Sequence, residues 1–300
     1  GYHATHLSGR GGGQIELIVK GELILDGEID MNGGDSPTSG GSGGSVKIVT
    51  NSLSGSGAIL AEGGSGGGGG GRIAVTVNGT NSFSGKISAK GGKLNRDQGS
   101  AGTIYLNENG VKRLIISGPS SEKTVITIDS DLDTTSWLLE LRDGTICEIQ
   151  QNISLHEFYS AGSGETLVIG PNSHVTFQNF TNEYSGSHCN LIIESAGKLV
   201  HRGTLYISGN SPKLEVKEGA IVDADKLVIG NDGILTVAST GKIQVSDLHM
   251  NEGSQIKLQR GSYMGLAQGS VSLHSIHLGY NATMSFSDDN ITIEVKSFEM

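Results

Sequence analysis

The stretch that decides the fold occurs three times, and its first copy reads Gly27-Glu28-Ile29-Asp30-Met31-Asn32-Gly33-Gly34. The later copies are Gly57-Ala58-Ile59-Leu60-Ala61-Glu62-Gly63-Gly64 and Gly85-Lys86-Ile87-Ser88-Ala89-Lys90-Gly91-Gly92. Side chains alternate between the two faces of a β-strand, so the isoleucine and the residue two places later point inward and the charged residues point outward. We therefore expect the three isoleucines to stack in one nearly fully buried column.

A second apolar strand recurs in step with this pattern. It starts after a Gly pair or an Ala-Gly pair, at Ile15, Val46, Ile73 and Ile104, with spacings of 31, 27 and 31 residues. Three glycine-rich loops lie between the copies, at residues 33–44, 63–71 and 91–102. Repeats in phase place equivalent loops at the same edge of a stacked structure. We call these segments the glycine loops.

The rest of the chain repeats at a shorter interval. Its strands are expected to start at Leu139, Leu167, Leu191, Leu214, Leu235, Ile256 and Met284, spaced by 28, 24, 23, 21, 21 and 28 residues. Five or six residues after each start comes a glycine or an asparagine, the residues that best tolerate positive φ. We expect left-handed corners at Gly144, Asn172, Gly197, Gly219, Gly241, Gly261 and Asn290, and a second buried column formed by Leu191, Leu214, Leu235 and Ile256.

Short strands that repeat at a fixed interval predict an all-β chain that coils so that each strand pairs with its equivalent one turn later. This is an elongated parallel β-solenoid, or β-helix. A β-sandwich fits less well, because its hydrophobic pattern does not repeat at one interval with a corner in phase. We expect two zones: residues 1–112 with glycine-rich repeats of about 27–31 residues, and residues 113–300 with repeats of about 21–28 residues.

Three segments of the first zone resemble the Gly-rich repeats of very large secreted or surface proteins of protists and bacteria. They are Gly70-Gly71-Arg72-Ile73-Ala74-Val75, the stretch Phe83-Ser84-Gly85 to Gly92, and Gly99-Ser100-Ala101-Gly102-Thr103-Ile104-Tyr105-Leu106. The resemblance covers about residues 9–118. It implies a right-handed parallel β-helix of the kind found in adhesins and extracellular fibres, and hence a structural role. No catalytic residues carry over from it.

Composition excludes several partner classes. The chain has 31 acidic and 21 basic residues, a net charge of −10, and no Lys/Arg cluster, so nucleic acid is not expected to bind. No run of about 18 apolar residues is present, so no membrane insertion is expected. With 48 glycines but 4 prolines, the chain fits neither collagen nor a Pro-rich linker.

The search for reactive groups yields no catalytic residue, no metal site and no cofactor. Asp129-Ser130-Asp131-Leu132-Asp133, with Glu140 twelve positions into the loop, approaches an EF-hand, but Thr134 stands where that loop requires Gly. A solvated acidic turn is the simpler interpretation. Cys147 and Cys189 lie at different phases of the repeat, and whether they are bridged stays open. We do not expect an enzyme.

The expected function is therefore a structural or adhesive segment of an extracellular or cell-surface protein, part of a larger chain or fibre. Its partners would be other copies or flanking repeats of the same protein, and glycans. The alternatives are a glycan-binding module and a polysaccharide-degrading β-helix. Seven aromatics form the one dense set, which we expect to be core more than a sugar platform: Tyr105, Trp137, Phe158, Tyr159, Phe177, Phe180 and Tyr184.

Two sets of residues are candidate sites. Five sequons point to a secreted glycoprotein, at Asn78, Asn152, Asn179, Asn281 and Asn290. The glycine loops are a candidate assembly surface, since residues without side chains let a partner backbone approach closely. Its candidate residues are Gly40, Gly41, Gly66, Gly67, Gly68, Gly69, Gly70 and Gly99. Ordering such loops requires backbone hydrogen bonds between neighbouring loops or with another chain.

Overall fold

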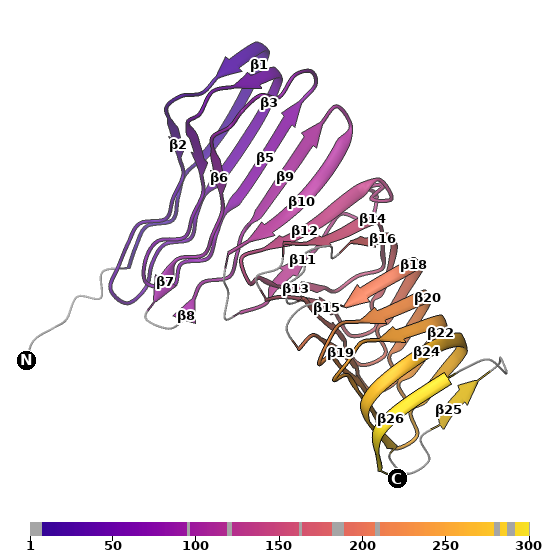
Figure 1. Cartoon of the computed structure of the whole chain (residues 1–300). Helices are drawn as coiled ribbons and strands as arrows, with labels where there is room; N and C mark the ends of the chain where they lie inside the picture. Colours follow the sequence, from indigo (N-terminus) through magenta and orange to yellow (C-terminus); the bar gives the residue numbers. More distant parts are fainter. Residues whose placement is uncertain are drawn as a thin grey trace, which may run out of the picture. The chain divides into compact units, whose positions relative to one another are not determined.

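The computed structural model describes residues 8–94, 97–118, 122–161, 164–181, 189–207, 211–278, 283–286 and 292–299, in which every regular element is a β-strand (Figure 1). The chain divides into two compact units. Unit 1 comprises Gly1–Thr124 with Trp137–Ile146, and unit 2 comprises Val125–Ser136 with Cys147–Met300. The expected boundary at residue 112 falls inside a strand of unit 1.

Unit 1 is built from parallel rungs. Its long strands are β1 (Gln14–Ile24), β3 (Ser45–Ser54), β5 (Arg72–Val77), β9 (Thr103–Glu108), β10 (Val111–Ser117) and β12 (Trp137–Arg142). The short strands β2 (Glu28–Asp30), β4 (Ala58–Leu60) and β6 (Lys86–Ser88) form a second parallel sheet, and β7 (Lys93–Leu94) pairs with β8 (Asp97–Gln98). Two further strands, β11 (Thr124–Ile126) and β13 (Ile146–Ile149), contain residues of both units.

The predicted registers of unit 1 are confirmed. Ile15 stands against Val46, Val46 against Ile73 and Ile73 against Ile104. On the other sheet Ile29 stands against Ile59, and Ile59 against Ile87. The core lies between the two sheets and includes Val46, Ile48, Leu53, Ile59 and Ile73.

The prediction that all three isoleucines are nearly fully buried is wrong for two of them. Ile59 has no exposed surface, whereas Ile29 and Ile87 are half-buried and pack against the core from its margin. Ile59 has a register partner on each side, but Ile29 and Ile87 each have one within the three-stranded sheet.

An antiparallel hairpin interrupts the parallel stack, which the repeat pattern did not predict. Strand β9 pairs antiparallel with β10, with Glu108 opposite Val111. The connecting residues Asn109 and Gly110 have φ values of 51° and 86°, as a two-residue type I′ turn requires. Strand β10 then pairs parallel with β12.

Unit 2 repeats one rung many times. Its strands are β14 (Ile153–Ser160), β15 (Glu165–Ile169), β16 (His174–Thr181), β17 (Cys189–Ile193), β18 (Lys198–Ile207), β19 (Lys213–Val216), β20 (Ile221–Ile229), β21 (Ile234–Val237), β22 (Lys242–Met250), β23 (Gln255–Leu258), β24 (Tyr263–Leu278), β25 (Thr283–Phe286) and β26 (Thr292–Glu299). Pairing along the longer strands is interrupted, as between Ala224 and Lys226 of β20, where the register with β22 is kept. Between β18 and β20 the register shifts after His201.

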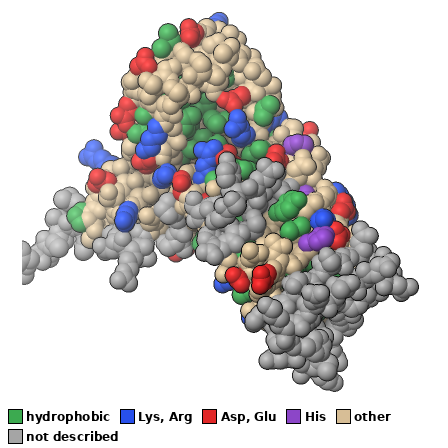
Figure 2. Space-filling model, viewed as in Figure 1, with side chains coloured by type: hydrophobic (Ala, Val, Ile, Leu, Met, Phe, Trp, Pro, Cys, Tyr) green, Lys and Arg blue, Asp and Glu red, His purple; other side chains and the backbone are tan. Residues whose placement is uncertain are grey.

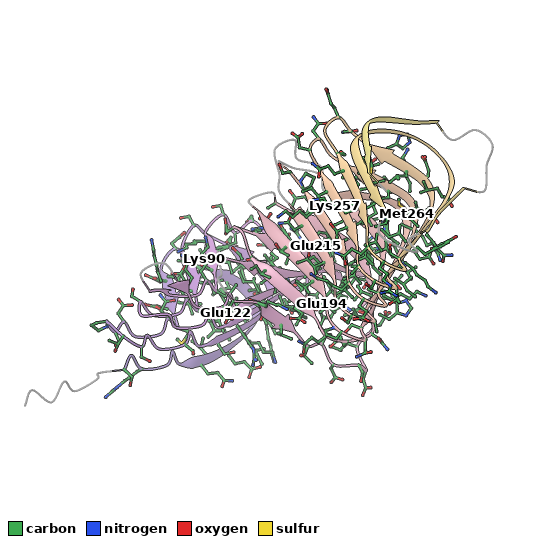
Figure 3. The ribbon with its side chains drawn as sticks, turned by 90° about the horizontal axis from the view of Figure 1, so that it is seen from below. Lys90, Glu122, Glu194, Glu215, Lys257 and Met264 are labelled. Atoms are coloured by element: carbon green, nitrogen blue, oxygen red, sulfur yellow. The ribbon has the colours of Figure 1, made fainter. Side chains whose placement is uncertain are left out.

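The predicted column of unit 2 is confirmed. Leu191, Leu214 and Leu235 have no exposed surface, Ile256 is 1% exposed, and each stands against the next. The outward position beside it carries Ile192, Glu215, Thr236 and Lys257, of which Glu215 and Lys257 are labelled in Figure 3. The prediction that Met284 starts the next equivalent strand is wrong. Ile276 stands against Ile256, whereas Met284 stands against Met264.

A repeated corner connects the strands. It is a β-turn in which the N–H of the fourth residue donates to the C=O of the first, as from Ala220 to Lys217 at 3.1 Å. The third residue has a φ between 54° and 79°. The residues in this position are Gly144, Asn172, Ala196, Gly219, Asp232, Thr240, Gly253 and Gly261.

The corner prediction is confirmed for Gly144, Asn172, Gly219 and Gly261 and wrong for Gly197 and Gly241. Gly197 is the fourth residue of its turn, and Ala196 takes the left-handed conformation. Gly241 occupies the fourth position of its turn, and Thr240 takes the left-handed conformation. Glycine is needed there for space, since a Cβ atom at Gly241 would lie 2.9 Å from the Lys217 carbonyl oxygen. Asn290 lies outside the described residues.

Candidate functional site

The glycine loops of unit 1 are held by hydrogen bonds to one another. One series of backbone bonds crosses all three loops: Gly41 donates to Gly34, Gly64 to Gly41, Gly68 to Gly64, Gly92 to Gly68 and Gly99 to Gly92, over 2.7–3.1 Å. Each loop runs outward and back as two extended arms outside any long strand (Figure 1). The loops therefore obtain their order from neighbouring loops of the same chain, one of the two sources expected from the sequence.

Close approach of backbones explains why these residues are glycine. A Cβ atom at Gly41 would lie 1.8 Å from the Arg10 carbonyl oxygen, one at Gly64 2.1 Å from the Gly34 oxygen, and one at Gly92 1.9 Å from the Gly64 oxygen. No side chain fits at such distances. None of these three glycines has a left-handed φ, so the requirement is space rather than backbone conformation.

The candidate assembly residues lie within this arrangement. A Cβ atom at Gly40, Gly68, Gly70 or Gly99 would come within 2.0–2.2 Å of a carbonyl oxygen of an adjacent segment. Gly66 and Gly67 have φ values of 107° and 84°. At Gly69 a Cβ atom would meet only the Ser100 hydroxyl, at 3.4 Å. Replacing Gly66 to Gly70 together would therefore damage the fold, and a test of assembly must use other residues.

Exposed polar side chains at the glycine loops offer that test. Thr38 and Ser42 are exposed, while the backbone around them is hydrogen-bonded: the Ser42 carbonyl accepts from the Gly12 N–H at 2.8 Å.

On the face drawn in Figure 2, unit 1 shows a group of hydrophobic side chains bordered by Lys, Arg, Asp and Glu side chains.

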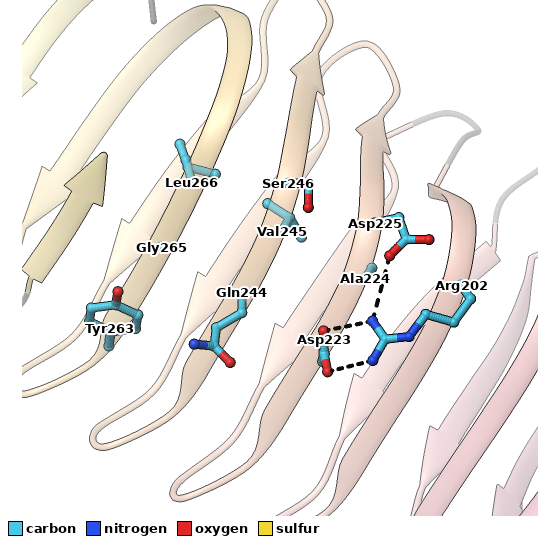
Figure 4. Close-up of a pocket in the computed structure, with 10 residues that line it drawn as sticks. All are labelled: Arg202, Asp223, Ala224, Asp225, Gln244, Val245, Ser246, Tyr263, Gly265 and Leu266. Atoms are coloured by element: carbon cyan, nitrogen blue, oxygen red, sulfur yellow. Dashed lines mark hydrogen bonds and ion pairs between the residues drawn. The ribbon is translucent and has the colours of Figure 1, made fainter. Parts of the chain in front are cut away.

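A groove on unit 2 is a second candidate site, and the sequence did not reveal it. Its volume is about 260 Å³ (Figure 4). The Arg202 guanidinium donates to both carboxylate oxygens of Asp223 at 3.1 Å and lies 3.5 Å from Asp225. The pair with Asp223 raises the pKa of the Arg202 guanidinium. Gln244, Ser246 and Tyr263 complete the polar lining.

The groove follows the repeat. Asp223, Gln244 and Gly265 are register partners on β20, β22 and β24, so one outward position supplies three of its lining residues. Gly265 leaves room for the Tyr263 hydroxyl, which would lie 2.8 Å from a Cβ atom there. The column could be found from the sequence once the rung length is known. The sequence could not show that Gly265, which has no side chain, opens a groove in this column.

The candidate glycosylation sites can be placed in part. Asn78 follows β5, Asn152 precedes β14 and Asn179 lies in β16, and all three are exposed. The Asn152 side-chain oxygen accepts a hydrogen bond from the His174 N–H at 2.8 Å. Asn281 and Asn290 lie outside the described residues.

The acidic stretch around Asp129 forms turns. The Asp129 carboxylate accepts from the Asp131 N–H at 3.1 Å, and the Asp133 carboxylate accepts from the Thr135 N–H at 3.0 Å. Glu140 pairs with Arg142 at 2.6 Å. In the part of the chain that the structure describes, no three His, Cys, Asp or Glu side chains are grouped so that they could hold a metal ion.

The two thiols are free and fully buried. Burial raises the pKa of the Cys189 thiol to about 12 and also raises the pKa of the Cys147 thiol. Both thiols are therefore protonated at neutral pH, the unreactive form.

The aromatic side chains that can be placed belong largely to the core. Phe158 and Phe177 are fully buried with ring centroids 5.7 Å apart. Trp137 is 8% exposed, and its ring packs at a tilt against Tyr105 with the ring centroids 5.1 Å apart. The side chains of Phe180 and Tyr184 lie outside the described part.

Across the described residues, no helix is long and apolar enough to cross a membrane.

Comparisons with known proteins give no family. No family model matches the chain. No curated protein matches it either. Among solved structures, the chain is similar to the C-terminal domain of a tapirin from Caldicellulosiruptor hydrothermalis, with 13% identity and a TM-score of 0.33. That match covers 97% of this chain and 58% of the tapirin chain.

Proposed function

We propose that this chain is a structural or adhesive segment of an extracellular or cell-surface protein and has no enzymatic activity. The observation that carries the proposal is the hydrogen-bonded stack of glycine loops in unit 1. Its glycines are required by close backbone contacts, as at Gly41 and Gly92. The glycine loops are therefore an ordered surface with few side chains. Such a surface is suited to close packing against a partner backbone.

The acidic balance of the chain supports the same proposal. The net charge of −10 favours solubility and disfavours nucleic acid as a partner. Exposed asparagines of three sequons, Asn78, Asn152 and Asn179, are compatible with secretion and glycosylation. The buried, protonated thiols require no particular redox compartment.

Assembly of the purified chain tests this function. Electron microscopy and sedimentation velocity over a range of concentrations should reveal filaments or larger assemblies. Thr38→Glu with Ser42→Glu places two charges on the exposed surface of the first glycine loop and should raise the concentration needed for assembly at least tenfold. The control is Ser82→Glu, an exposed position after β5 and outside the glycine loops.

Two results would reject the structural function. One is a chain that stays monomeric at every concentration and depolymerises a polysaccharide. The other is assembly that is unchanged in the variant with two added charges but lost in the control. Thermal unfolding of each variant shows whether the fold is kept.

Glycan binding at the groove of unit 2 is the second candidate function. The groove combines the Asp223 and Asp225 carboxylates, the Gln244 amide and the Tyr263 ring, groups that bind hydroxyls and the apolar face of a sugar. Titration with soluble oligosaccharides, followed by the intrinsic fluorescence of the chain or by calorimetry, should show saturable binding that Gln244→Ala weakens. Binding that is unchanged in this variant would remove the groove from consideration.

A further inference from the structure

The first strand of unit 1 leaves the core incompletely covered. Along β1, the inward residues Ile15, Leu17 and Leu23 are half-buried. Their register partners on β3 are buried: Val46 is 1% exposed, Ile48 0% and Leu53 1%. The same core position is therefore sealed in the second rung and open in the first. Figure 1 shows β1 at the outer end of the strands of unit 1.

Glycine is kept at this open face where nothing described requires it. One series of register-equivalent glycines precedes the long strands: a Cβ atom at Gly44 would lie 1.9 Å from the Gly13 oxygen, one at Gly71 2.0 Å from the Gly44 oxygen, and one at Gly102 2.0 Å from the Gly71 oxygen. Gly13 is the first member. A Cβ atom there would meet only the flexible end of Met31, at 3.3 Å.

A second series shows the same pattern. A Cβ atom at Gly57 would lie 2.0 Å from the Gly27 oxygen, and one at Gly85 2.0 Å from the Gly57 oxygen. Gly27 is the first member, and no described atom lies within 4 Å of a Cβ atom placed there. In every later rung the glycine is needed because the preceding rung presents a carbonyl oxygen. Gly13 and Gly27 are also glycines, although no described residue presents a carbonyl oxygen to either of them.

We propose that the β1 face of unit 1 receives one more glycine-rich rung, a flanking repeat of the same type stacked in parallel register. This deepens the proposed structural function by naming the partner of unit 1, and it rests on that function. The added rung would bring its carbonyl oxygens against Gly13 and Gly27 and would cover Ile15, Leu17 and Leu23.

Charge on β1 also favours such a rung. Glu16 pairs with Lys47 of β3 at 2.9 Å, and these two are register partners. Glu22 and Glu28 are exposed on the same rung. A second β1 from another copy of the chain would add two more β1 carboxylates, Glu16 and Glu22, to this face. A rung like that of β3 would instead place a lysine beside Glu16.

The experiment inserts a copy of residues 40–66 between Ser8 and Gly9 of the full chain. This segment is one rung of the repeat, and it ends where Gly9 takes the place of Gly67, four residues before the Gly that precedes the next strand. The measurement is amide hydrogen exchange of peptides that cover β1 and β2. The inserted rung should slow exchange of the β1 amides at least tenfold.

Glycine variants decide whether the rung stacks as proposed. In the original chain, Gly13→Ala with Gly27→Ala should leave exchange and melting unchanged. In the chain with the inserted rung, the same pair should abolish the gain in protection. Gly21→Ala is the matched control. No described atom lies within 4 Å of its Cβ atom, and it lies in the register shift between Val19 and Glu22, where β3 contributes Asn51 and no glycine. It should be neutral in both chains.

Three outcomes would overturn the proposal. The inserted rung could leave β1 exchange unchanged. The two alanines could be neutral in both chains, which would make Gly13 and Gly27 remnants of duplication. Protection of β1 in the original chain could rise with protein concentration, which would assign the face to a second copy. The first two readouts are made at concentrations at which the chain is monomeric, so they are independent of whether filaments form.

Discussion

A methyl group added at Gly41, Gly64 or Gly92 would come within about 2 Å of a carbonyl oxygen of the adjacent segment. Individual glycines of unit 1 are therefore fixed by packing between backbones. Elsewhere, single residues are fixed by burial in a column or by a left-handed φ at a corner. These three constraints have different energetic costs, and each predicts a different response to substitution.

Burial predicts unequal effects within one column. Ile59 has no exposed surface, while its register partner Ile29 is half-buried. Ile59→Ala should lower the free energy of unfolding by about 2–5 kcal/mol, because it removes apolar contacts and leaves a cavity. Ile29→Ala should cost less than half as much, since part of its side chain already contacts water. Urea unfolding of both variants measures the difference, and equal losses would contradict the open β1 face.

The corner predicts that one substitution stabilises and its neighbour destabilises. Thr240 has a φ of 58°, which strains a β-branched residue. Thr240→Gly should therefore raise the free energy of unfolding by about 0.5–1 kcal/mol. Gly241→Ala should lower it, because its Cβ atom would lie 2.9 Å from the Lys217 oxygen. Thermal melting of the two variants distinguishes this corner from the one expected from the sequence, in which Gly241 is the left-handed residue.

One carboxylate predicts a dependence on pH. The Ser117 hydroxyl donates to Asp143 at 2.6 Å and lowers the pKa of that carboxyl, and Lys90 at 3.1 Å acts in the same direction. A lowered pKa stabilises the folded state above the ordinary value of 3.8, and this contribution is lost as the pH falls through the folded value. Asp143→Asn should remove about 0.5 kcal/mol at pH 7 and less at pH 2. An equal loss at both pH values would exclude the ionic contribution.

At the scale of elements, much of the strand register could be read from the sequence. Period-two alternation around Ile59 and Leu214 fixed the inward faces, because a slip by one residue would move every side chain to the opposite face. The corners could be read only in part. Because glycine tolerates positive φ best, we expected glycine at the left-handed position. At three corners Ala196, Asp232 and Thr240 take that conformation, and the glycine is the next residue, where a Cβ atom would be crowded. The contacts that crowd this position come from the turn itself, as at Gly233, or from the preceding rung, as at Gly241, and neither can be read from the sequence.

The hairpin of unit 1 was missed although its signal is local. Asn109-Gly110 between two apolar strands is a strong hairpin sequence, but a repeat of parallel rungs gives no reason to look for one. The groove of unit 2 was missed for another reason. It depends on which outward residues share a column and on the missing side chain at Gly265. The hydrogen bonds among the glycine loops were expected, but which arms they join was not.

The hairpin yields a prediction for its turn. Gly110 has a φ of 86°, and no described atom lies within 4 Å of a Cβ atom there. Gly110→Ala should therefore cost about 1 kcal/mol through backbone strain alone, without a steric clash. Gly110→Asn should cost less, since asparagine tolerates this region better. Unfolding of both variants by urea checks the order, and equal costs would indicate that packing rather than φ determines the turn.

At the scale of the whole molecule, stacked repeats predict that complete rungs can be removed. Within unit 2, Lys198 stands against Ile221 and Ile221 against Lys242, and Leu214 stands against Leu235 and Leu235 against Ile256. Deleting residues 221–241 joins Ala220 to Lys242. Ala220 occupies the same fourth corner position as Gly241, so the junction keeps the geometry of the turn.

The shortened chain should fold with Leu214 against Ile256 and Leu199 against Ile243, because each rung contacts mainly its neighbours. Some loss of stability is expected, about 1–3 kcal/mol, since Val245 would pack against His201 in place of the smaller Ala224. Deleting residues 221–231 removes half a rung and places the next strand on the wrong face. Circular dichroism and urea unfolding should show a cooperative transition for the complete deletion and its loss for the partial one. If the two deletions were equally tolerated, the stability of unit 2 would not depend on the register of its rungs.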